Sequence, residues 1–393
     1  MRLPERPPAV TMLAMCRSKS SFDLARRLAL HGLLAFTLLG LAPAVTRSPA
    51  ADQTPVTPGE VGFDEIIFVK RKPYSSDHYY TDINNGTSPD RFLPENGIYI
   101  YNLRARSERA VVTAAQLPGG KGFIGKISLS FDARKVLFDF REHPGAGFRI
   151  WEVGADGTGL RQVSFPPNDE AEKVARWAPG WHTDDIHPCY LPDGRIIFSS
   201  TRCEHTVLCG GSGHLVAPGL YSMDANGGDV RQLTNSPVSE FCPVMLDDGR
   251  VMYHRWEYID RGARVSKTIW AMNPDGTRPQ ELFGIADDAT PVYMYPQPLP
   301  GNSHAFVCVA SCHFPQGGCL GSIDVVDFGK GLRTISDLAA RDGTPSPRLQ
   351  KLHSTVEVDE ESMNNGDALA AGWGWLEAFA PFAGVQFAAA SPR

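Results

Sequence analysis

Apolar residues in this chain fall in short runs or alternate with polar ones, and over these stretches no helical three-to-four spacing competes. One pattern recurs: a proline, a short apolar stretch, a turn, and a second apolar stretch that ends in polar residues. It is clearest at residues 187–198 and 242–253, each with an Asp-Gly-Arg turn, and weaker at 295–307 and 131–138. Asp-Gly between two β-type runs predicts a hairpin, because glycine accepts the positive φ that the turn needs.

A second hairpin follows three of these segments. It covers residues 150–163, 220–233 and 269–282, so a full unit holds two hairpins, or four strands. The turns of successive units are about 50 to 60 residues apart, which suits a four-stranded blade with its loops. Residues 65–103 are interpreted as one more, irregular unit at the start of the repeat.

Tandem four-stranded units predict the fold class. A four-stranded antiparallel sheet cannot bury both faces alone, so repeated sheets have to pack against one another. We therefore expect an all-β fold, a β-propeller of four-stranded antiparallel blades over residues 64–336. A sandwich of the same hairpins is the alternative. Residues 337–393 are interpreted as a degenerate sixth blade, a short helical cap or an irregular tail, so the propeller is six-bladed or truncated.

The N-terminus has the features of an export signal. Four basic residues between Arg17 and Arg27 precede the apolar run 28–41, and Ala42-Pro43-Ala44 supplies a cleavage pattern. We expect a signal peptide over residues 1–44, a linker over 45–63, and a periplasmic or extracellular protein. An uncleaved anchor is the alternative. No later segment is apolar enough to predict a membrane span.

Charge and cysteine content narrow the partners and the compartment. The formal net charge is -6 at pH 7, so a nucleic-acid partner is not expected. Seven of the eight cysteines follow the signal, and an odd number leaves at least one free, paired between chains or bound to a ligand. For the short loop between Cys203 and Cys209 we expect a local disulfide, as in an oxidising compartment.

The Asp-Gly-Arg turns followed by Leu-Tyr-x-Met and Ile-Trp-x-Met hairpins resemble the repeats of the TolB-like six-bladed propellers of bacterial envelopes. Residues 185–260, with Ser-Thr-Arg-Cys at 200–203 and Arg-Trp-Glu-Tyr at 255–258, more specifically resemble proteins related to the hydrazine synthase alpha subunit. The resemblance implies a propeller in the cell envelope. That enzyme family joins nitric oxide and ammonia at c-type haems held by CxxCH motifs. This chain has no CxxCH, so the activity is not carried over.

Two thiols and a histidine gather at Cys308, Cys312 and His313. These residue types are needed for thioether attachment and axial ligation of a c-type haem, although the spacing is one residue longer than usual. The sequence therefore gives haem c as one candidate cofactor. A strand end that carries a disulfide partner is the alternative explanation.

A second group of metal-ligating residue types lies earlier in the chain. Imidazole, carboxylate and thiolate are all competent ligands for zinc. The candidate ligands are His182, Asp185, His187, Cys203, His205 and Cys209. Their spacing matches no closed zinc motif, so zinc is a candidate cofactor without a defined geometry.

Three side chains are candidates for a ligand site at the mouth of the central channel. Asp185, Glu240 and Tyr293 occupy the equivalent place ahead of each unit's proline, so we expect them near the innermost strands. Such positions from successive blades converge on one mouth, where propellers usually bind ligands. The alternative is that the two carboxylates accept hydrogen bonds within and between blades, since buried carboxylates must be paired.

The sequence contains no GxSxG elbow, phosphate loop, dinucleotide fingerprint or HExxH motif. We therefore expect an exported binding or scaffold protein related to the hydrazine synthase alpha subunit, with a protein or small ligand at the channel mouth. The alternative is a haem- or metal-dependent redox enzyme of the hydrazine synthase alpha type.

Overall fold

The computed structural model describes residues 63–71, 92–176, 182–206, 216–256, 267–284, 292–299, 302–311, 323–327 and 331–334. The chain divides into two units, Met1–Pro55 and Val56–Arg393, and all described residues belong to the second. The expected signal at 1–44, nearly all of the linker and the segment 337–393 lie outside the described residues. No helix in the described part of the chain is long and apolar enough to cross a membrane.

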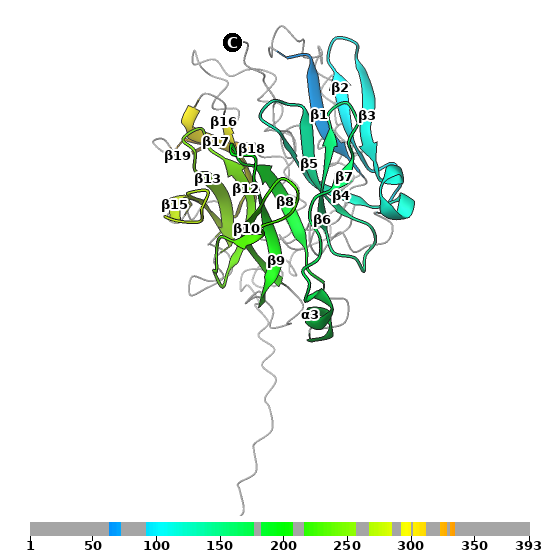
Figure 1. The fold of residues 1–393 in the computed structure, drawn as a ribbon. Coiled ribbons are helices and arrows are strands. Elements are labelled where there is room, and N and C mark those ends of the chain that lie inside the picture. Colours follow the sequence, from blue (N-terminus) through cyan, green and yellow to red (C-terminus); the bar gives the residue numbers. More distant parts are fainter. Residues whose placement is uncertain are drawn as a thin grey trace, which may run out of the picture. The chain divides into compact units, whose positions relative to one another are not determined.

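The strands form antiparallel sheets in chain order (Figure 1). The first sheet holds β1 (Glu65–Lys70), β2 (Gly97–Asn102) and β3 (Ser107–Thr113), and the second holds β4 (Phe123–Leu129), β5 (Lys135–Arg141), β6 (Arg149–Gly154) and β7 (Arg161–Gln162). The third holds β8 (Asp185–Tyr190), β9 (Ile196–Thr206), β10 (Val216–Met223) and β11 (Arg231–Gln232). Short helices lie between sheets: η3 (Ala114–Gln116), η4 (Pro118–Gly120) and α3 (Glu170–Arg176).

The last eight strands repeat the same order twice. The fourth sheet, or blade, holds β12 (Ser239–Met245), β13 (Val251–Trp256), β14 (Lys267–Met272) and β15 (Gln280–Phe283). The fifth holds β16 (Val292–Leu299), β17 (Asn302–Ser311), β18 (Ile323–Asp327) and β19 (Gly331–Thr334). A single parallel bridge, between Lys267 and Val292, joins these two groups of four. Each group is otherwise an antiparallel meander.

The hairpins predicted from the Asp-Gly turns are confirmed. Gly194 lies in the turn that joins β8 to β9, and Gly249 lies in the turn that joins β12 to β13. Their φ angles are 87° and 86°, a backbone region that residues other than glycine rarely adopt. The innermost strands contact one another in series, β4 with β8, β8 with β12, and β12 with β16. The fold is therefore all-β and propeller-like, built of four-stranded antiparallel blades.

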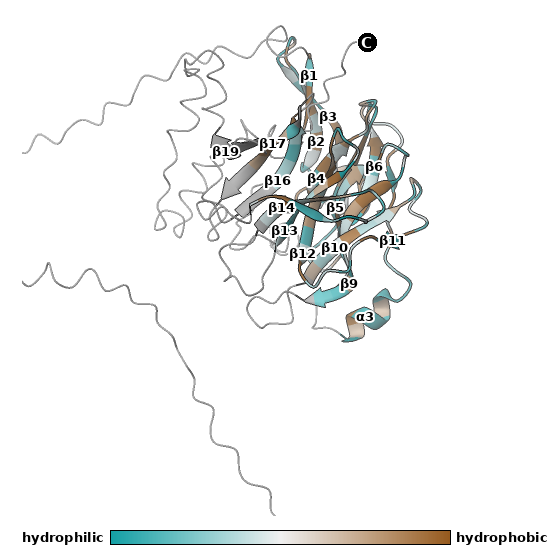
Figure 2. Ribbon diagram, turned by 90° about the vertical axis from the view of Figure 1, so that its left-hand side faces the viewer, coloured by the Kyte–Doolittle hydropathy of each residue, from teal (hydrophilic) through white to brown (hydrophobic). Residues whose placement is uncertain are grey.

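Apolar side chains fill the spaces between successive sheets, and Figure 2 shows hydrophobic residues concentrated in the strands. Strand β9 illustrates why. Ile196 and Phe198 pack on Leu137 of the second sheet, whereas Ile197 points the opposite way and packs on Tyr253 of the fourth. Successive side chains of a strand point to opposite faces, so each blade is buried on both sides by its neighbours. Because both faces of a blade are apolar, a blade needs a neighbour on each side, and a tandem array supplies them.

Candidate functional site

The three predicted channel-mouth positions are equivalent in backbone register. Their partners on the second strand of each blade are Ser200 for Asp185, Arg255 for Glu240, and Ala310 for Tyr293. In all three blades one further residue pair separates this pair from a bulge in the inner strand. The side chain of Tyr293 is outside the described part of the structure, so the geometry below concerns the two carboxylates.

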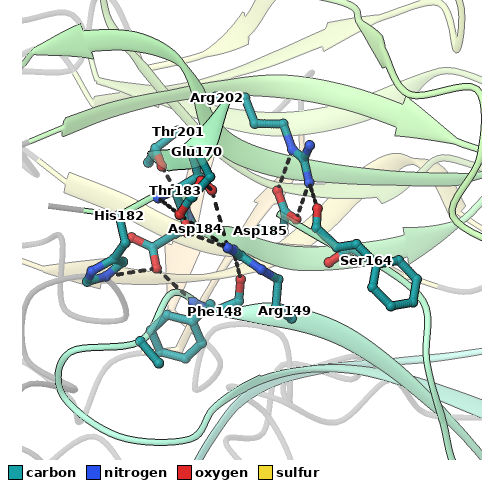
Figure 3. Close-up of polar contacts among 12 residues, drawn as sticks. Phe148, Arg149, Ser164, Glu170, His182, Thr183, Asp184, Asp185, Thr201 and Arg202 are labelled. Atoms are coloured by element: carbon teal, nitrogen blue, oxygen red, sulfur yellow. Dashed lines mark hydrogen bonds and ion pairs between the residues drawn. The ribbon is translucent and has the colours of Figure 1, made fainter. Parts of the chain in front are cut away.

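Asp185 is fully buried and forms an ion pair with Arg202 (Figure 3). Arg202 donates from Nε to Oδ1 at 2.9 Å and from Nη2 to Oδ2 at 2.7 Å, and Ser200 Oγ donates to Oδ1 at 2.7 Å. Arg202 also donates to the carbonyl oxygen of Phe165, in the segment that follows the second sheet. The pair therefore links neighbouring blades, which is the arrangement expected for a buried carboxylate.

Glu240 is also buried, and the distance to its arginine is longer. Arg255 Nη1 lies 3.7 Å from Glu240 Oε1, and the guanidinium carbon is 4.4 Å from the centre of the Trp270 ring. The Arg255 side chain is 20% exposed, against 11% for Arg202. The fourth blade thus presents a partly exposed cation beside a buried carboxylate.

Asp184, which precedes Asp185 in the chain, is a third buried carboxylate in this region. His182 Nε2 is 3.4 Å from Asp184 Oδ1 and 3.2 Å from Arg141 Nη2, and the Phe148 amide donates to Asp184 Oδ1 at 2.8 Å (Figure 3). Burial opposes ionisation of Asp184, but the charges of His182 and Arg141 outweigh it, so the pKa of Asp184 lies below its ordinary value. Burial lowers the pKa of Arg141, against the attraction of Asp184.

Helix α3 is fastened to this region by Glu170. Its carboxylate accepts hydrogen bonds from the Thr183 amide at 3.0 Å and from the Thr183 hydroxyl, and Arg149 Nη2 lies 3.4 Å away. Lys173 of the same helix donates to the Arg202 carbonyl oxygen at 3.0 Å. The connection between the second and third sheets therefore packs against the residues around Asp185.

The bulges themselves bring together side chains that the sequence reasoning did not group. His187, Cys242 and Tyr295 occupy the equivalent bulge position and have φ angles of 55°, 53° and 54°, uncommon for residues other than glycine or asparagine. His187 Nδ1 lies 3.5 Å from Cys242 Sγ. Lys126 Nζ, from the β4 bulge, lies 3.5 Å from the centre of the Tyr295 ring. The signal was visible in the sequence, because a proline follows each of these three residues.

Asp139 connects two of the bulges. Its Oδ1 accepts the Lys126 amide at 3.1 Å and its Oδ2 accepts the His187 amide at 2.8 Å. Asp139 lies on β5 and is fully buried, so one carboxylate fixes the inner strands of the second and third sheets to each other. This role could not be predicted from the sequence, because Asp139 stands inside an apolar run.

The predicted zinc ligands are placed in separate surroundings. His205 Nδ1 is 2.8 Å from the Ser236 carbonyl oxygen, and Cys203 Sγ is 3.4 Å from the Ala217 carbonyl oxygen. Across the described ranges no three His, Cys, Asp or Glu side chains form a group suited to a metal ion. Cys209 lies outside those ranges, so zinc at the full predicted set stays a prediction.

Among the described thiols, Cys189, Cys203 and Cys242 are free. Burial raises the pKa of the Cys203 thiol, and its disulfide with Cys209 stays a prediction. Cys308 is buried in the apolar cluster with Met252 and Phe306. Its two expected companions in haem attachment, Cys312 and His313, lie outside the described residues, so haem c also stays a prediction.

No family model matches the sequence, and no curated protein matches it. Among solved structures, the chain is similar to hydrazine synthase from Kuenenia stuttgartiensis, with 17% identity and a TM-score of 0.49 over 69% of this chain and 38% of that one. It is also similar to TolB from Acinetobacter baumannii (14% identity, TM-score 0.41, 69% of this chain and 52% of that one). A putative TolB from Agrobacterium tumefaciens gives 14% identity and a TM-score of 0.43 over 69% of this chain and 88% of that one.

The match therefore spans well under half of the hydrazine synthase chain and about half of the Acinetobacter TolB chain. These neighbours are the two groups that the repeat resembles. At such identities the order and packing of the sheets carry the fold assignment, and activity is a separate question.

Proposed function

We propose that this protein is an exported propeller that acts as a binding or scaffold module, related to the hydrazine synthase alpha subunit, and takes a protein or small ligand at its channel mouth. The proposal rests on one observation. Asp185 and Glu240 stand at the same register on adjacent inner strands, and each carries an arginine. Polar groups from successive blades therefore gather at one end of the inner strands, the place where loops and strand ends in propellers recognise ligands.

The two ion pairs at this mouth have different roles in the proposal. The short Asp185–Arg202 pair holds two blades together. Arg255 lies farther from the Glu240 carboxylate, and its side chain is partly exposed. A ligand with an acidic or polar group can reach Arg255 without breaking the tighter pair. We therefore place ligand contact at the Glu240 side and support at the Asp185 side.

Asp184, which precedes Asp185 in the chain, carries a fixed charge, and this favours recognition over proton transfer. A general acid or base works best with a pKa near the operating pH. The pKa of Asp184 is held below its ordinary value, so this carboxylate stays ionised at neutral pH. An ionised, buried carboxylate orients its arginine and histidine neighbours, which suits a preorganised binding surface.

The test uses the exported protein together with any ligand or partner that remains bound to it on purification. We expect the chain recovered from the cell envelope to lack residues 1–44 by intact mass, and native mass spectrometry to show a bound ligand or partner. In Arg255→Gln the bound fraction is expected to fall at least about tenfold, since a charged hydrogen-bonding group contributes about 1.5–3 kcal/mol.

Arg231→Gln is the matched control, because Arg231 is an exposed arginine that pairs with Asp229 in the third blade. It should keep the ligand. Equal loss in both variants, or a chain that retains residues 1–44 in the cytoplasm, would overturn the proposal.

A second candidate function is favoured by the His187–Cys242 pair. Zinc bonds of about 2.3 Å to sulfur and about 2.0 Å to nitrogen, at a tetrahedral angle, place the two ligand atoms about 3.5 Å apart. His187 Nδ1 and Cys242 Sγ are 3.5 Å apart, and both side chains are buried. His187 belongs to the set predicted from the sequence and Cys242 does not, and among the described residues no third His, Cys, Asp or Glu completes a group with them, so the metal candidate rests on this pair alone.

Metal analysis separates this candidate from a hydrogen-bonded thiol and imidazole. We expect about one zinc per chain after incubation with Zn²⁺ and gel filtration, and loss of that zinc in Cys242→Ser. Cys189→Ser is the control, because Cys189 is as deeply buried but its Sγ donates to the Tyr190 carbonyl oxygen at 3.4 Å. Zinc that is absent from the wild type, or retained in Cys242→Ser, rules the metal function out.

A further inference from the structure

An aromatic pair joins the second and third strands of the second, third and fourth blades. It stands in the same register in three blades, as Phe138–Trp151, Phe198–Tyr221 and Tyr253–Trp270. In the first sheet the same pair is Phe68 of β1 with Tyr99 of β2, whose ring centres are 6.0 Å apart. The three strands of the first sheet therefore correspond to the second, third and fourth strands of a blade.

The first blade therefore has no innermost strand among the described residues. There β1, its second strand, pairs only with β2. In the other blades the innermost position is taken by β4, β8, β12 and β16, each paired with the second strand of its own blade. No described strand takes it in the first.

The face of the first sheet that would meet a preceding blade is less covered than its equivalents. Ile66 and Phe68 are half-buried, whereas Ile67, on the other face, is buried in the cluster shared with the second sheet. The equivalent side chains on the second strands of the next two blades, namely Val136, Phe138, Ile196 and Phe198, are all fully buried. This lower burial is expected for a sheet face against which no neighbouring blade packs.

The opposite end of the repeat shows the same condition. On β17, Phe306 and Cys308 pack on the fourth sheet, while Val307, between them, points the other way and is half-buried. The first sheet thus has an apolar face without a described neighbour, and on the fifth sheet the described part of the corresponding face is Val307, half-buried, and Ala305, buried. One further blade would cover both.

We propose that residues 335–393 cover the apolar face of the first sheet formed by Ile66, Phe68 and Tyr99. The length of this segment is close to that of the four-stranded repeat, and it follows β19, the last strand of the fifth blade. It also carries apolar side chains in quantity, among them Trp373, Trp375, Phe379, Phe382 and Phe387. The occupant is therefore the chain's own C-terminal segment, and burial of this aromatic surface supplies the driving force.

The test measures how accessible the face is. In a full-length Phe68→Cys variant we expect the introduced thiol to react with a maleimide at least tenfold more slowly than in the same variant ending at residue 334. Phe131→Cys is the control, because Phe131 is 68% exposed at the β4–β5 turn and should react equally fast in both lengths. Peptide mapping distinguishes the introduced thiols from the natural ones.

Two further measurements keep the result interpretable. Hydrogen exchange of β9 reports whether the shortened chain keeps its fold, and full-length Trp373→Glu/Trp375→Glu repeats the test without truncation. Rapid labelling of Phe68→Cys in the full-length protein overturns the proposal. Protection that rises with protein concentration overturns it too, because a second copy would then be the cover.

Discussion

Replacing Asp185 with asparagine is expected to lower the free energy of unfolding by about 3 kcal/mol. The asparagine keeps the volume and can still accept the Ser200 hydroxyl, but it leaves the largely buried Arg202 without its carboxylate. A buried charge without a partner is the costly element, since the attraction that offset its desolvation is gone. Chemical denaturation followed by circular dichroism measures the change.

Asp229→Asn serves as the comparison, because exposed ion pairs contribute at most about 1 kcal/mol. A double variant, Asp185→Leu with Arg202→Met, should recover much of the lost stability, since apolar side chains of similar volume often replace a buried pair without loss. If Asp185→Asn were as stable as Asp229→Asn, the structural role of Asp185 would be wrong, and ligand contact would have to include the third blade.

The repeated hairpins were predictable because their signals are local. The Asp-Gly turns at Gly194 and Gly249 set the pairing of β8 with β9 and of β12 with β13 through backbone geometry alone. The continuous apolar run from Ile196 to Phe198 then predicts a strand buried on both faces. Strand order followed from these two features without knowledge of any distant contact.

The candidate site was predictable only in part, because its contacts join residues far apart in the chain. The equivalence of Asp185 and Glu240 followed from the repeat, but the partners that fix them, such as the Phe165 carbonyl oxygen, depend on how blades meet. The prolines that follow His187 and Cys242 were visible. The left-handed backbone at these residues, and the contact between their side chains, required coordinates.

Gly125→Ala is expected to lower the free energy of unfolding by about 2–5 kcal/mol, although it adds one methyl group to a glycine with ordinary backbone angles. A Cβ at this position would overlap the Asp139 carboxylate. The carboxylate would have to leave the amides of Lys126 and His187, and each buried donor left without an acceptor costs about 1–3 kcal/mol.

Gly145→Ala isolates this effect from the general cost of replacing glycine. The nearest atom to a Cβ at position 145, apart from its chain neighbours, is His143 Nδ1 at 3.5 Å, an ordinary contact, so the change should stay within about 0.5 kcal/mol. The comparison decides what joins the second and third blades at the axis. If Gly125→Ala proved as mild as Gly145→Ala, the apolar packing of Leu137 on Phe198 would join them, and Asp139 would be dispensable.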